Sequence, residues 1–110
     1  MAKYMVLYRS STPPSEQMGN MTPEQAQAGM EAWMTWAGKA GSAIVDLGSP
    51  LQTVGSVGKG GSSGQPIGGF SILEADSVDA LEKVLDGHPH FMSPGDTSIE
   101  ILEFLPVPGM

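Results

Sequence analysis

The first segment able to form a strand, from Lys3 to Arg9, is apolar or aromatic at all five of its central positions. Successive side chains of a strand point to opposite faces of a sheet, so Tyr4, Val6 and Tyr8 share one face and the residues between them share the other. Such a strand needs cover on both sides of its sheet. The helices of the chain can cover one face of the sheet, and the second face requires cover from another source.

A helix is predicted to start at Thr22-Pro23-Glu24-Gln25, which combines an N-cap, a proline at the first helical position and the glutamine of a capping box. Apolar residues then recur at helical spacing, and Gly41 is a suitable stop. Ala26, Met30, Trp33 and Ala37 form this stripe. Trp33 is expected in the core, whereas Trp36 lies off the stripe and is expected at a cleft rim or against a partner chain.

A second helix is predicted after the capping segment Asp76–Asp79, with Leu81, Val84 and Leu85 as its apolar face. Gly87 is expected to end it in a left-handed conformation. The other strand-like segments are Ala43–Leu47, Gly69–Ala75 and Ile99–Leu105.

The resulting order, βαββαβ, is typical of a ferredoxin-like α+β fold: a four-stranded antiparallel sheet with two helices on one face. We expect one domain over residues 1–110, with a flexible loop rich in glycine and serine at 48–66. Because both faces of the sheet are apolar, we expect a homodimer that forms through the uncovered sheet faces.

Composition narrows the classes of function. The formal net charge of -7 argues against nucleic acid and anionic lipid as partners, and no apolar run approaches the roughly 20 residues that a bilayer requires. Without cysteine there is no disulfide and no thiolate chemistry. The expectation is a cytoplasmic protein with neutral or aromatic small molecules as its ligands.

Three stretches, Met21–Trp36, Gly68–Ser77 and Asp86–Phe91, resemble the YCII-related (YciI-like) family of small dimeric α/β-barrel proteins. The resemblance spans nearly the whole chain. It implies a ferredoxin-like protomer, sheet-to-sheet dimers and a cleft between helices and sheet. Some members resemble enzymes of aromatic breakdown with a His–Asp pair, but their catalytic histidine belongs to the first helix, and this first helix has none.

The histidines here follow the second helix. His88 lies seven residues after Leu81 and four after Val84, so it would extend the inward helix face, with Asp46 as a candidate carboxylate partner. A histidine that caps the helix or is hydrogen-bonded in the core is the alternative. The candidate ligand-binding residues are Tyr4, Tyr8, Arg9, Trp36, Phe70 and His90. Ordinary core packing, and an ion pair for Arg9, are the competing interpretations.

Metal and nucleotide sites are not predicted. His88-Pro89-His90 with Asp86 and Asp96 lacks the spacing of a metal site, and Gly58-Lys59 is followed by Gly60 instead of Ser or Thr, so it is not a P-loop. No cofactor is expected.

Two functions remain open. One is a cofactor-independent enzyme in which His88 performs acid/base chemistry on a small neutral or aromatic molecule. The other is a non-catalytic ligand-binding or accessory dimer. A cleft that holds His88 beside a carboxylate with open space favours the first, and a cleft filled by Trp33, Met30 and Phe70 favours the second.

Overall fold

The computed structural model describes residues 1–12, 14–60, 64–93 and 95–109. Its strands are β1 (Ala2–Ser10), β2 (Ile44–Pro50), β3 (Ile67–Ala75) and β4 (Thr97–Glu103). They form one sheet in the order β2-β3-β1-β4, with every neighbouring pair antiparallel. This is the ferredoxin-like α+β arrangement predicted from the order of elements.

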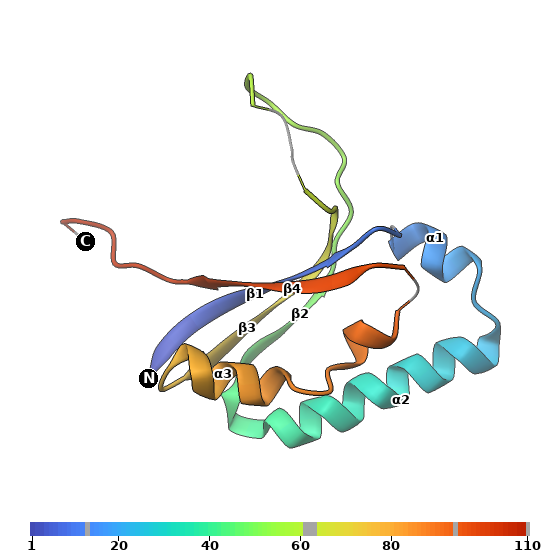
Figure 1. Ribbon diagram of the computed structural model, residues 1–110, viewed down its shortest axis with the longest axis horizontal. Coiled ribbons are helices and arrows are strands. Elements are labelled where there is room, and N and C mark those ends of the chain that lie inside the picture. The colour runs from blue at the N-terminus through green and yellow to red at the C-terminus, as the bar shows by residue number, and fades with distance from the viewer. Residues whose placement is uncertain (13, 61–63, 94, 110) are drawn as a thin grey trace.

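The helices lie on one side of the sheet (Figure 1). They are α1 (Pro14–Gly19), α2 (Pro23–Ala40) and α3 (Val78–Leu85), with the short 3-10 turns η1 (Gly41–Ala43) and η2 (Pro89–Met92). Helix α1 is not among the helices predicted from the sequence. In the described ranges, no helix has the length and apolarity needed to cross a bilayer.

Local chemistry sets the ends of α2 and α3. The Thr22 hydroxyl accepts a hydrogen bond from the Gln25 backbone N–H at 3.1 Å, and the Gln25 amide oxygen accepts one from the Thr22 N–H at 3.0 Å, which completes the predicted capping box. Ser77 caps α3 through the Ala80 N–H. After α3 the chain turns at Gly87 with φ of 69°, in the left-handed region that favours glycine.

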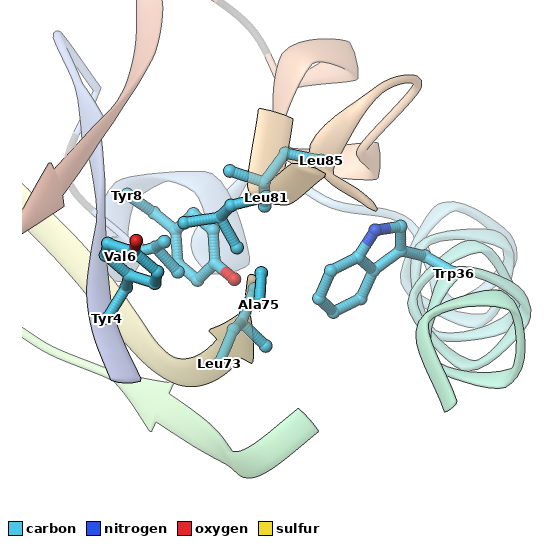
Figure 2. Close-up of a cluster of buried hydrophobic side chains, with 8 residues drawn as sticks. All are labelled: Tyr4, Val6, Tyr8, Trp36, Leu73, Ala75, Leu81 and Leu85. Atoms are coloured by element: carbon cyan, nitrogen blue, oxygen red, sulfur yellow. The ribbon is translucent and has the colours of Figure 1, made fainter. Parts of the chain in front are cut away.

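The core lies between the sheet and the helices (Figure 2). Alternate residues of β1 and β3 point into it, and Leu81 and Leu85 from α3 and Trp36 from α2 close over them. The buried apolar set is Tyr4, Val6, Tyr8, Trp36, Leu73, Ala75, Leu81 and Leu85. We call this side of the sheet the inner face.

The opposite side of the sheet, the open face, has no element of the chain packed over it in Figure 1. The strand register places five apolar side chains there: Met5, Leu7, Phe70, Ile72 and Leu102. The first four are half-buried, and Leu102 is exposed. The two-sided apolar pattern of β1 is therefore realised in the sheet.

Strand β2 is irregular. Its pairing with β3 shifts register on both sides of Asp46. Gly48 has φ of 86°, and a Cβ atom there would collide with the backbone carbonyl of Phe70. Only glycine allows β2 to approach β3 this closely.

The predicted loop at 48–66 is shorter in the structure, because β2 continues to Pro50. Residues 51–60 form neither helix nor strand and rise from the sheet on the side away from the helices (Figure 1). Residues 61–63, part of the same prediction, lie outside the described residues.

Candidate functional site

His88 lies at the centre of a group of rings on the inner face. Its imidazole centroid is 4.2 Å from the Trp36 ring, 4.6 Å from the Trp33 ring and 4.9 Å from the Tyr8 ring. The His90 ring lies 5.3 Å from Tyr8. We call these five residues the His88 cluster.

The end of α3 places His88 in this cluster. The left-handed turn at Gly87 reverses the chain, and the His88 N–H donates to the Leu85 carbonyl at 3.1 Å. Pro89 then begins η2, with His88 as its N-cap. His88 therefore points inward as expected, but from the turn beyond α3, since the helix ends at Leu85.

The hydrogen bonds of His88 define its tautomer. The His90 backbone N–H donates to Nδ1 of His88 at 3.0 Å, so Nδ1 is the unprotonated nitrogen. A neutral His88 then carries its proton on Nε2. The side chain is only 1% exposed, and Nε2 has no hydrogen-bond partner among the described residues.

Burial keeps His88 neutral. Loss of solvation, with a smaller contribution from the neighbouring His90, lowers the pKa of His88 to about 4. At neutral pH the ring is a donor through Nε2–H and a poor proton acceptor, because its conjugate acid is too strong.

His90 holds η2 against the sheet. Its Nε2 lies 2.8 Å from the Arg9 carbonyl oxygen and 3.1 Å from that of Ser98, so Nε2 must carry the proton and donate to them. The predicted ligand-binding role of His90 therefore competes with a structural one that the geometry already explains.

Tyr8 extends the cluster through two hydroxyl hydrogen bonds. Its phenol donates to Ser71 Oγ at 2.7 Å, and Ser71 donates to the Leu47 carbonyl at 2.6 Å. Burial raises the pKa of Tyr8 to about 12, although the hydrogen bond with Ser71 opposes the rise. Tyr8 stays protonated at neutral pH. Sequence reasoning missed Ser71, whose signal is a polar residue at an inner position of β3.

The structure reverses the predicted positions of the two tryptophans, core for Trp33 and rim for Trp36. Trp36 is 3% exposed and donates from its indole nitrogen to the Val84 carbonyl at 2.9 Å, so its expected position at a rim is wrong. Trp33 is half-buried and is the most accessible ring of the cluster. Met30, expected to share the core stripe with Trp33, is 63% exposed.

The other predicted site residues divide between the two faces. Tyr4 is buried on the inner face, four residues before Tyr8. Phe70 lies on the open face, where Arg9 pairs with Glu100 at 2.7 Å. Asp46 is exposed and accepts a hydrogen bond from the Gly48 N–H, while no carboxylate is bonded to His88 within the described ranges. The structure therefore does not bring Asp46 to His88.

Two further features lie apart from this arrangement. No group of three His, Asp or Glu side chains in the described part of the chain could hold a metal ion. A surface hollow on α3, lined by Asp79, Glu82, Lys83 and Asp86, shares no residue with the cluster. The space around His88 is occupied by Trp33, Trp36 and Tyr8, while Met30 and Phe70 lie elsewhere.

Comparison with known proteins supports the fold. Neither the protein-family models nor the curated proteins contain a match to this chain. Among solved structures, the chain is similar to 5-chloro-2-hydroxyhydroquinone dehydrochlorinase from Burkholderia phenoliruptrix AC1100, in a complex with 2,5-dihydroxybenzoquinone. The TM-score is 0.50 at 20% identity, over 89% of this chain and 90% of that one.

Proposed function

We propose that this protein is a dimeric, YCII-related domain that binds a small, neutral, oxygen-bearing aromatic or quinoid molecule through the Nε2–H of His88. One observation carries the proposal: a buried imidazole N–H has no acceptor within the described part of the chain. Leaving such a donor unpaired costs roughly 1–3 kcal/mol. A ligand oxygen at this position removes that cost.

The side chains that surround His88 favour a neutral, planar ligand. Trp33, Trp36 and Tyr8 offer ring faces and edges for stacking on a planar molecule. No lysine or arginine side chain belongs to the cluster, and His88 is neutral, so a charged carboxylate or phosphate would lose its solvation without gaining a counter-charge. A carbonyl or phenol oxygen suits the site better.

A ligand is expected to reach His88 past the side chain of Trp33. The other four members of the cluster are buried, with His90 the least so at 7% exposed, whereas Trp33 is half-buried on α2. A rotation of the Trp33 side chain exposes His88 without disturbing the hydrogen bond of Trp36 to α3. Binding should therefore change tryptophan fluorescence, and the chain has only two tryptophans.

The test is a fluorescence and calorimetric titration with 2,5-dihydroxybenzoquinone and simple neutral phenols. His88→Asn keeps an acceptor near the Nδ1 position but removes Nε2–H, and we expect it to weaken binding about tenfold, the loss of one hydrogen bond. His88→Gln places an amide N–H near Nε2 and should recover part of the affinity. Equal binding by folded His88→Asn and wild type would contradict the proposal.

A cofactor-independent enzyme is the second candidate, and the fold comparison favours it because the similar structure is a dehydrochlorinase bound to a quinoid molecule. A neutral imidazole can polarise a substrate carbonyl by donating a hydrogen bond to the oxygen that gains charge. In this chain His88 would act as that donor, since its pKa of about 4 makes it a weak base. Turnover that is lost in His88→Asn supports the enzyme, and binding without turnover supports the ligand-binding module.

The dimer rests on the open face. Its centre is apolar, and its charges lie near the strand ends or on the edge strand β4: Arg9 pairs with Glu100, and Lys3 is in register with Glu74. An apolar centre with a polar rim is the usual anatomy of a protein interface. A second copy suits this face because Arg9 at its rim is already paired with Glu100 within each protomer.

Sedimentation equilibrium at micromolar concentration should give the mass of two chains. Ile72→Lys, at the apolar centre, should raise the dimer dissociation constant about 100-fold, because each copy then buries an unpaired ammonium group. A wild-type mass of one chain throughout the accessible concentration range would rule out the dimer.

A further inference from the structure

Residues 51–60 project from the sheet on the side of the open face (Figure 1). Every residue in this segment is exposed, including two β-branched apolar side chains, Val54 at 95% and Val57 at 98%. We call residues 51–60 the arm. Within its own protomer the arm has no surface on which to bury these valines.

The base of the arm is held at both ends. Leu51 donates from its backbone N–H to the Gly68 carbonyl at 3.0 Å on the outgoing side. On the return side, the Arg9 guanidinium donates to the Gln65 carbonyl at 2.5 Å, and the Gln65 amide donates to the Asp96 carbonyl at 3.2 Å. Leu51 and Gln65, on either side of the loop that contains the arm, are thereby held at the sheet.

The arm also differs in charge from the rest of the molecule. Lys59 is its only charged residue, whereas the whole chain carries a net charge of -7. A second copy therefore presents an acidic surface to a weakly basic arm, and this attraction operates between copies as well as within one. Lysine at an exposed tip also discourages unspecific pairing of the arm with other strands.

We infer that the arm embraces a second copy of this chain that sits on the open face. The inference rests on the proposed dimer and adds the part of the protein that holds it together. Packed sheets lie about 10 Å apart. The chain leaves the sheet at Leu51, and at roughly 3.3 Å for each extended residue Val54 can lie about 10 Å and Val57 about 20 Å from that point, far enough to reach the edge of the partner's sheet and be buried there.

A lid over the His88 cluster is the competing role for the arm. The cluster lies on the inner face beneath α2, and the arm leaves the opposite side of the sheet (Figure 1). Within one protomer, the arm would have to cross the sheet edge and the helix layer to reach Trp33. Its direction therefore favours the neighbouring copy.

The test compares dimer dissociation constants by sedimentation velocity over a dilution series. Val54→Ser with Val57→Ser should raise the dissociation constant at least tenfold while the circular dichroism spectrum is unchanged. Met30→Ser with Met34→Ser is the matched control, because it removes two exposed apolar side chains, 63% and 58% exposed, from α2 on the helix side. The control should leave the dissociation constant within twofold of wild type.

Lys59→Glu gives a second, electrostatic readout. It should weaken the dimer more at 20 mM salt than at 500 mM, since screening shortens the range of the repulsion. A dimer that forms normally in both the valine and the lysine variants overturns the role of the arm and leaves the sheet-to-sheet dimer intact. A wild-type protein that never dimerises overturns both.

Discussion

The two faces of strand β1 differ in how deeply their side chains are buried. On the inner face Tyr4, Val6 and Tyr8 are almost completely buried by the helices. On the open face Met5 and Leu7 keep part of their surface in water. The sequence makes the two faces similarly apolar, so the difference lies in what covers them. The chain covers its inner face with its own helices, and none of the described helices packs over its open face.

Polar groups show the same contrast. On the inner face the side chains of Tyr8, Ser71, His90 and Trp36 all have hydrogen-bond partners, and among the described residues His88 Nε2 is the buried side-chain atom without one. On the open face Arg9 and Glu100 form an ion pair at the rim. An isolated unpaired donor in an otherwise satisfied core is a stronger indication of a ligand site than an exposed polar surface would be.

The largest expected difference in stability is between alanine substitutions of one aromatic residue on each face. Trp36→Ala should lower the free energy of unfolding by about 3–5 kcal/mol, because it opens a cavity and leaves the Val84 carbonyl unpaired. Phe70→Ala, on the open face, should cost less than about 2 kcal/mol in the monomer. Urea unfolding at concentrations below dimer formation measures both, and equal losses would contradict the division into a complete and an incomplete face.

Acid should lower the stability of the protein mainly through protonation of His88 on the inner face. The pKa of His88 is about 4 in the folded protein and about 6.5 when unfolded, so the unfolded state takes up the proton first as pH falls. Stability from this group is complete above pH 6.5 and declines by up to roughly 3 kcal/mol by pH 4. Urea unfolding at a series of pH values measures the slope. A slope in His88→Asn as steep as that of wild type would exclude His88 as its source.

The smallest effect separates two tyrosines of equal burial. Tyr8→Phe should cost about 1 kcal/mol, because its hydroxyl donates to Ser71. Tyr4→Phe should change stability by less than about 0.5 kcal/mol, since its hydroxyl makes no hydrogen bond among the described residues. Thermal unfolding of both variants tests the difference, and the reverse order would mean that the Tyr8–Ser71 bond contributes nothing.

Local signals in the sequence were enough for the fold. The capping box at Thr22 and Gln25 and the left-handed glycine at Gly87 fixed helix ends, because these interactions are made within a few residues. The alternation in β1 predicted correctly which residues share a face. The predicted strand ends differ from the observed ones by up to three residues, as expected where pairing partners decide the ends.

The site was less predictable because it depends on long-range geometry. The first two turns of α2 are fully exposed, so the apolar stripe begins near Gly29, and Trp36 faces the core instead of Met30. Asp46 lies between two register shifts of β2, where alternation no longer tells which way a side chain points. The unpaired Nε2 of His88 follows from the His90 N–H, a contact that no spacing rule encodes.

The most direct test of the central claim is the nitrogen chemical shifts of His88, read from a long-range ¹H–¹⁵N spectrum at pH 7. We predict a neutral ring with its proton on Nε2, no titration above about pH 5, and a change in the Nε2–H signal when a neutral quinone or phenol binds. A ring that titrates near pH 6.5, or that carries its proton on Nδ1, would contradict it.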